Sequence, residues 1–242
     1  LLDKKSLVEN IKNFDLVIDL ASVVRSINKK KYDENVVGLT NLIGAMEKNK
    51  MKKIIYFSTQ NVILKSKGFY AKSKVECEKL LTDSKLDYLI VRPNYVYEIG
   101  KDNNFFKLAS MISKFNVALV IGKGKNKFQP ILREDLARIV ARTIKNYEPR
   151  TIIEACGKET TNLDEVIRKI GESLGKKPLV LKLPVKIARI FEHFLYFDVI
   201  GADEDRIASE NYKICGDSSF SGDLKKITEL VQESYDISTD WR

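Results

Sequence analysis

Short apolar segments alternate along this chain with segments whose apolar residues recur at helical spacing. Nearly continuous apolar strands that alternate with amphipathic helices are typical of β-α-β units, in which a parallel sheet is buried on both faces. Because crossovers between parallel strands are right-handed, the pattern predicts an α/β fold built on a doubly wound, Rossmann-like parallel sheet. The predicted strands are residues 16–20, 53–57, 88–91, 117–121 and 151–155.

The pattern changes after Cys156, where the chain is mostly of helical character. We therefore expect a smaller, mostly helical C-terminal lobe that packs on the sheet. A doubly wound nucleotide site normally begins with a strand and a glycine-rich turn, and no G-x-G-x-x-G sequence is present. The Rossmann-like sheet is thus expected to be incomplete at its N-terminus, with upstream residues that complete it.

The charge of the chain is high but scattered. The formal net charge is +9, hydrophobic residues make up 44% and charged residues 31%, which favours a globular protein. No basic run is interleaved with aromatic residues, so we predict a lysine-rich solvated surface and no nucleic-acid partner. The lysine clusters are residues 29–31, 48–53, 65–67 and 123–127.

Cysteine and histidine are too few and too dispersed for a zinc site. The three cysteines follow no metal-ligand spacing, and His193 is the single histidine, so no metal is expected. The most apolar stretch, residues 183–200, is interrupted by charged side chains and cannot span a bilayer. With no signal peptide in view, we expect a cytoplasmic protein without a membrane span.

Tyr70 and Lys74 lie one turn apart on the same face of a predicted helix. A phenol has an ordinary pKa of about 10, and a fixed ammonium nearby favours the phenolate and lowers that pKa. The pair therefore suits general acid/base work on an alcohol or ketone. In a lysine-rich chain, however, this spacing also arises by chance, and two solvated helix residues are the alternative.

The surroundings of the pair favour the chemical interpretation. Ser58 and Thr59 follow the strand that precedes the helix, and residues 92–97 leave the next strand. The carboxyl ends of parallel strands meet at one edge of an open α/β sheet, which is where ligands bind. The sequence therefore predicts that three polar elements converge on one crevice.

Several segments resemble those of a known family. Residues 15–22 (DLVIDLAS) are similar to a strand that ends in H-L-A-A, and residues 35–42 (NVVGLTNL) to a helix with the pattern N-V-x-G-T-x-N-L. Residues 58–62 (STQNV) match S-[ST]-x-x-V, and Tyr70 and Lys74 match Y-x-x-x-K. In this order the segments resemble the extended short-chain dehydrogenase/reductase superfamily, and within it the NAD(P)-dependent nucleotide-sugar epimerase/dehydratase group.

The resemblance continues through Arg92-Pro93 and through residues 128–137, which are similar to f-x-P-v…D-[VL]-A. It implies that residues 1–155 form an NAD(P)-binding domain, with a substrate-side excursion at about residues 94–131. Residues 156–242 would then form a small substrate-binding lobe.

The family also implies a cofactor, a substrate and a set of roles. NAD or NADP is the implied cofactor, and the substrate is expected to be a small molecule, a nucleotide sugar. Tyr70 would exchange the proton of a substrate hydroxyl, Thr59 would hydrogen-bond the same oxygen, and Lys74 would hold the nicotinamide ribose. The residues implied at the cofactor are Leu20, Ala21, Ser22, Asn35, Ser58, Tyr70, Lys74, Pro93 and Val96.

Asn94 and Gln129 are expected at the substrate, although amides at loop ends more often satisfy backbone groups. Two functions remain open. The first is an NAD(P)-dependent oxidoreductase or epimerase, and the second is a non-catalytic NAD(P)-binding sensor or assembly protein. The intact set of Thr59, Tyr70 and Lys74 favours the first. The short loop before Tyr70, and Glu98 where the family has glycine, favour the second. A homodimer is possible in either case.

Overall fold

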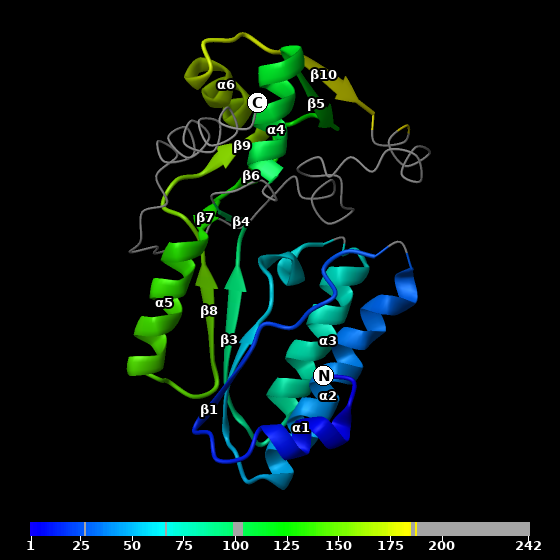
Figure 1. Cartoon of the computed structure of the whole chain (residues 1–242), viewed down its shortest axis with the longest axis vertical. Coiled ribbons are helices and arrows are strands. Elements are labelled where there is room, and N and C mark those ends of the chain that lie inside the picture. The colour runs from blue at the N-terminus through cyan, green and yellow to red at the C-terminus, as the bar shows by residue number, and fades with distance from the viewer. Residues whose placement is uncertain (27, 66, 99–103, 185–186, 188–242) are drawn as a thin grey trace, which may run out of the picture. The chain divides into compact units, whose positions relative to one another are not determined.

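The computed structural model describes residues 1–26, 28–65, 67–98, 104–184 and 187 (Figure 1). The chain divides into two compact units. Unit 1 comprises Leu1–Pro93 and Ile139–Ala155, and unit 2 comprises Asn94–Arg138 and Cys156–Arg242. The predicted excursion and the predicted lobe thus fall in the same unit. Substrate binding by that unit stays a prediction, and most of the helical segments predicted after residue 184 lie outside the described residues.

Unit 1 is built on a parallel sheet of four strands in the order β1-β2-β3-β8. Helices α2 and α3 connect β1 to β2 and β2 to β3. The bounds of the strands are Leu16–Asp19 for β1, Lys53–Phe57 for β2, Asp87–Pro93 for β3 and Thr151–Ala155 for β8. The helical elements are α1 (Lys4–Asn10), η1 (Lys29–Tyr32), α2 (Asp33–Lys48), η2 (Gln60–Ile63), α3 (Phe69–Asp83) and α5 (Arg133–Lys145), of which the part from Ile139 belongs to unit 1.

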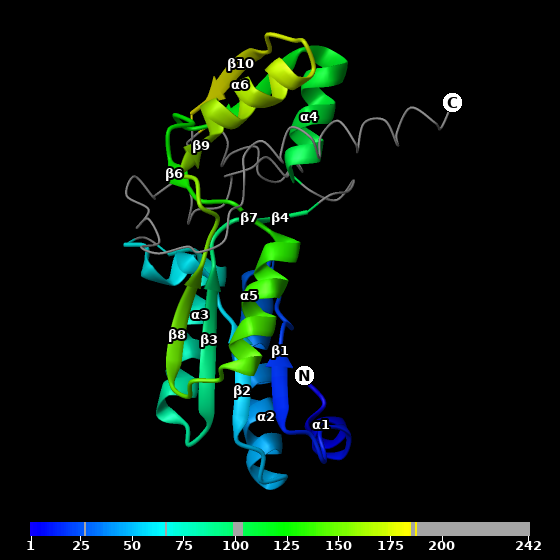
Figure 2. The ribbon, with the colours of Figure 1, turned by 90° about the vertical axis from the view of Figure 1, so that its left-hand side faces the viewer.

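The sheet of unit 1 has helices on both faces, as Figures 1 and 2 show: α2 and α3 lie on one face and α5 on the other. Strand side chains alternate in direction, so Ile54 and Tyr56 of β2 pack toward α2 and α3. They share a buried cluster with Met46 of α2 and with Cys77 and Leu81 of α3. Burying each of these large apolar side chains stabilises the fold by about 1.5–3 kcal/mol. The predicted doubly wound α/β class is thus confirmed.

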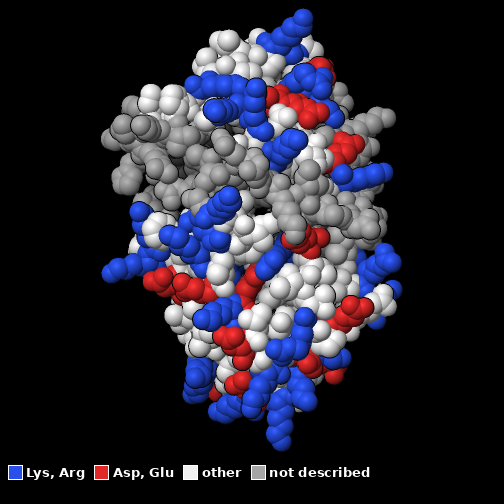
Figure 3. All heavy atoms as spheres, turned by 180° about the vertical axis from the view of Figure 1, so that it is seen from behind, with Lys and Arg blue, Asp and Glu red and all other residues white. Residues whose placement is uncertain are grey.

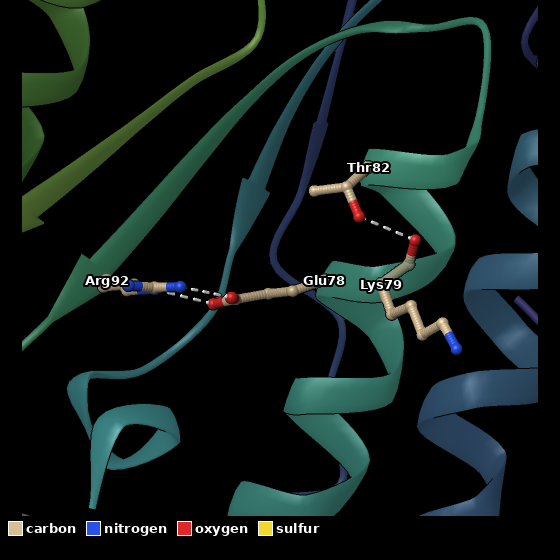
Figure 4. A network of polar contacts seen from close by, with 4 residues as sticks. All are labelled: Glu78, Lys79, Thr82 and Arg92. Carbon is tan, nitrogen blue, oxygen red and sulfur yellow. Dashed lines mark hydrogen bonds and ion pairs between the residues drawn. The ribbon is translucent and has the colours of Figure 1, made fainter.

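An ion pair ties α3 to β3 on the same side of the sheet (Figure 4). The Arg92 guanidinium donates from Nε to Oε1 of Glu78 at 2.9 Å and from Nη2 to Oε2 at 2.6 Å. The two side chains are only 19% and 10% exposed, respectively. The geometry is bidentate, which matches the planar fork of arginine to a carboxylate. The pair therefore fixes the helix that carries Tyr70 and Lys74 against the strand that precedes Pro93.

Unit 2 has a core of its own between α4 (Asn104–Phe115) and α6 (Leu163–Ser173). Its buried cluster includes Phe105, Ile112 and Ile170. Three two-stranded sheets accompany the helices in the described part, and the sequence analysis missed their shortest strands. The pairs are β5 (Val117–Ile121) with β10 (Leu179–Leu183), β4 (Val96–Tyr97) with β7 (Ile131–Leu132), and β6 (Lys127–Phe128) with β9 (Thr161–Asn162).

The charged surface agrees with the scattered lysines of the sequence. Figure 3 shows Lys and Arg side chains over the whole described face, with Asp and Glu among them. None of the helices in the described part is both long enough and apolar enough to cross a membrane. No group of three or more His, Cys, Asp or Glu side chains that could hold a metal ion occurs among the same residues.

Candidate active site

The carboxyl ends of β1 and β2 bring the expected site residues of unit 1 to one edge of the sheet. Asp19 ends β1, and Ser58 and Thr59 follow β2 directly. The adjoining 3-10 helix η2 leads into α3, whose second residue is Tyr70. In an open parallel sheet this edge is the ligand-binding edge.

Lys74 is buried at this edge, with only 2% of the residue exposed. Its Nζ donates a hydrogen bond to the carbonyl oxygen of Phe57 at 2.7 Å. The same nitrogen lies 4.5 Å from the centre of the Tyr56 ring and 5.9 Å from the centre of the Tyr70 ring. Attraction between a cation and an aromatic face supports the ammonium in this position. Tyr70 and Lys74 are therefore neighbours at the end of β2, rather than two solvated helix residues.

Burial lowers the pKa of Lys74, because an ammonium removed from water is disfavoured. The carboxylates of Asp19 and Glu78 oppose this decrease in pKa electrostatically. Burial also raises the pKa values of the Tyr56 phenol and the Cys77 thiol, so both groups are neutral near pH 7. Near neutrality, the negative charges around Lys74 are therefore carboxylates.

Two hydroxyl groups follow β2. Thr59 caps η2, since its Oγ1 accepts a hydrogen bond from the backbone N–H of Asn61 at 3.3 Å. Ser58 is 3% exposed, and its Oγ has no hydrogen-bond partner in the described part of the chain. A buried hydroxyl without a partner costs free energy unless a ligand or water satisfies it. The Ser58 hydroxyl is therefore available to a ligand or water at this edge, and its contact with a cofactor stays a prediction.

Asn35 clamps the loop after β1 to both neighbouring helices. Its Oδ1 accepts from the backbone N–H of Val23 at 2.6 Å and lies 3.4 Å from the Ser22 hydroxyl. Its Nδ2 donates to the Val23 carbonyl at 3.1 Å and to the Ser73 hydroxyl at 3.0 Å. The expected cofactor loop is thus held in place by Asn35, which is itself buried on α2. In the structure, Asn35 positions the loop, and direct contact with the cofactor stays a prediction.

Replacing Asn35 with alanine is expected to lower the free energy of unfolding by about 1–3 kcal/mol, because the N–H of Val23 loses its partner. Chemical denaturation of the variant and the wild type measures the difference. Asn41→Ala is the matched control on the same helix, since among the described residues that amide donates only to the carbonyls of Leu1 and Leu2, at 3.3 and 3.4 Å. If Asn35→Ala lowers the free energy of unfolding no more than Asn41→Ala does, Asn35 does not hold the loop after β1 in place.

The remaining expected residues are divided between the units. Leu20 and Ala21 follow β1 and are exposed, and Pro93 ends β3, all in unit 1. Val96 lies in unit 2, on β4, and is 40% exposed. Their contact with a cofactor stays a prediction.

Asn94 and Gln129 meet within unit 2. The Oδ1 of Asn94 accepts from the backbone N–H groups of Tyr95 and Gln129, at 2.7 and 3.2 Å. Gln129 is 4% exposed, and its Nε2 donates to the Gly157 carbonyl at 3.2 Å. These bonds go to the backbone, which was the alternative weighed for both amides. Their role at a substrate stays a prediction.

Asp19 is the site residue that the sequence analysis missed. Its carboxylate is 5% exposed and accepts a hydrogen bond from the backbone N–H of Ala21 at 3.0 Å. The sequence did hold a signal, because a charged residue lies within the apolar strand predicted at residues 16–20. Such residues are almost never fully buried unless they are paired.

Comparison with known proteins agrees with the family resemblance seen in the sequence. The family model described as NAD(P)H-binding matches residues 1–147. The chain is 26% identical to N-acetyl-alpha-D-glucosaminyl-diphospho-ditrans,octacis-undecaprenol 4-epimerase of Escherichia coli O157:H7. That match covers 78% of this chain, and the chain spans 63% of the length of this curated relative.

The solved structures of similar fold include nucleotide-sugar enzymes. UDP-glucuronic acid 4-epimerase from Bacillus cereus, in complex with UDP-glucuronic acid and NAD, has a TM-score of 0.75 at 16% identity, over 98% of this chain and 79% of the other. dTDP-glucose 4,6-dehydratase from Bacillus anthracis, in complex with NAD, has a TM-score of 0.74 at 14% identity, over 99% and 79%. These findings confirm the family resemblance and the implied cofactor. The chain belongs to the NAD(P)H-binding family, its cofactor is NAD or NADP, and its fold is that of the nucleotide-sugar epimerases and dehydratases.

Proposed function

We propose that this protein is an NAD(P)-dependent oxidoreductase or epimerase that acts on a hydroxyl or keto group of a sugar, with Tyr70 as the general acid/base. One observation carries the proposal. The Lys74 ammonium is buried at the carboxyl end of β2, bonded to Phe57 and 5.9 Å from the Tyr70 ring. A cation held there favours the phenolate form of Tyr70, which a proton-accepting phenol requires.

Each expected catalytic residue has a defined part in this reaction. Tyr70 removes the proton from the substrate hydroxyl and returns a proton to the same oxygen. Thr59 places its hydroxyl group next to η2, where it donates a hydrogen bond to that oxygen. Lys74 stabilises the phenolate and holds the ribose of the cofactor. Bound NAD(P) supplies the acceptor for the hydride that leaves the sugar carbon, and the donor that returns it.

The substrate we propose is a sugar linked to a diphosphate, with a nucleotide sugar as the first choice. The solved structures of similar fold carry UDP- or dTDP-sugar names, whereas the curated relative is named for a sugar on undecaprenyl diphosphate. The diphosphate-linked sugar is common to both. A nucleotide sugar and a lipid-linked sugar are therefore the two arms of the test.

The test combines cofactor binding with turnover. Fluorescence titration with NADH and NADPH identifies the dinucleotide, and proton NMR follows UDP- and dTDP-sugars and a lipid-diphosphate sugar. We expect one dinucleotide to bind and one sugar to interconvert with its epimer or to be oxidised. Binding without turnover of any member of the panel would overturn the enzymatic proposal and support the non-catalytic sensor or assembly protein.

A further inference from the structure

We propose that Asp19 is a positioning residue that keeps the Lys74 ammonium charged and turned inward against the end of β2. The family pattern at this strand end is H-L-A-A, whereas this chain has Asp19-Leu20-Ala21-Ser22. A carboxylate thus stands where a neutral ring would be typical. The expected effect of Asp19 on turnover rests on the proposed function, whereas its expected effect on the charge of Lys74 does not.

The strand register brings Asp19 to Lys74. Asp19 of β1 is the register partner of Tyr56 on β2, so the two side chains lie side by side on the same face of the sheet. This face is covered by α2 and α3, as the buried cluster around Tyr56 shows. The side chain of Lys74, from α3, lies over the same ring, with Nζ 4.5 Å from the centre of the Tyr56 ring. The carboxylate and the ammonium therefore flank one aromatic ring in a buried layer.

The other charged groups around Lys74 are already neutral or paired. From α3, Glu78 is engaged bidentately by the Arg92 guanidinium. Tyr56 from β2 and Cys77 from α3 lie in the same buried cluster, and burial keeps both protonated. Tyr70 of α3 is the proposed acid/base itself, and α2 contributes the uncharged amide of Asn35.

Asp19 is therefore the carboxylate that is left to balance the buried ammonium. In the described part of the chain its carboxylate accepts a hydrogen bond from the N–H of Ala21, and the cations that act on it electrostatically are Lys74 and, more weakly, the N-terminal ammonium of Leu1. Burial raises the pKa of Asp19, and the nearby Lys74 opposes that increase. Each group thus favours the charged form of the other.

The test is Asp19→Asn, which keeps the size of the side chain and removes its charge. NMR of the ζ-amine of Lys74, in protein labelled at lysine, follows its protonation as the pH is raised. We expect the midpoint for Lys74 to fall by at least about one pH unit in the variant, a tenfold loss of proton affinity. Asp15→Asn, at an exposed position just before β1, is the control and should leave the midpoint unchanged.

A midpoint that does not move in Asp19→Asn would overturn the proposal. If this variant does not fold, Asp19→Glu keeps the proposal testable, since it restores the charge and should retain a midpoint within about half a pH unit of the wild type. In turnover assays, the alkaline loss of kcat should move to lower pH by the same amount in Asp19→Asn. Because the NMR experiment uses neither substrate nor cofactor, its result separates this inference from the proposed function.

Discussion

Replacing Tyr70 with phenylalanine is expected to lower kcat by about 10²- to 10⁴-fold, because the substitution removes the one hydroxyl that exchanges the substrate proton. The ring, the helix and the neighbouring ammonium remain. NADH or NADPH should bind with nearly unchanged affinity, since Lys74 and the loop after β1 are untouched. Steady-state kinetics and fluorescence titration of the same preparation measure both quantities.

Tyr88→Phe is the matched control for this prediction. Tyr88 lies on β3 near its amino end and is the register partner of Ile54. It is buried, so its substitution also removes one hydroxyl from a packed ring, but at the opposite end of the strand from the site. Its kcat should match that of the wild type. Equal kcat values for Tyr70→Phe and Tyr88→Phe would show that Tyr70 exchanges no proton in the rate-limiting reaction.

Removing the carboxylate of Glu78 is expected to lower the free energy of unfolding by about 3 kcal/mol. Glu78→Ala leaves the largely buried guanidinium of Arg92 without its bidentate partner (Figure 4). Breaking a buried pair from one side leaves an uncompensated charge, whose desolvation is no longer offset. Thermal or urea unfolding measures the loss.

The double variant Glu78→Leu with Arg92→Met separates charge from packing. Replacing both partners of a buried pair by apolar side chains of similar volume is often close to neutral. We therefore expect the double variant to recover most of the stability lost in Glu78→Ala. A double variant as unstable as Glu78→Ala would mean that volume, and not the unpaired charge, sets the cost.

Much of the fold could be predicted from the sequence, because apolar residues recur at a different spacing in strands and in helices. The apolar runs at residues 53–57, 117–121 and 151–155 coincide with β2, β5 and β8. The two-residue strands β4, β6, β7 and β9 were not predicted, since pairs this short carry no periodicity and form only where tertiary contacts bring two loops together.

The sequence predicted the residues of the candidate site only where they belong to a recognisable motif. The sequence brought Tyr70 and Lys74 together through helical spacing, which is local. It did not show that Lys74 bonds to Phe57, or that Asp19 lies beside Tyr56. Those neighbours come from strand register, which is set by pairing between distant segments. The clamp between Asn35 and Ser73 joins two helices and was invisible for the same reason.

The central claim is hydride transfer at a sugar carbon with Tyr70 as the acid/base. The most direct measurement uses the sugar that turns over, labelled with deuterium at the reacting carbon, and follows the label by NMR in ordinary water. The account predicts that deuterium stays with the product or moves to the nicotinamide, and that Tyr70→Phe slows this transfer at least about 100-fold. Deuterium that washes into water, replaced by hydrogen at that carbon, would contradict hydride transfer.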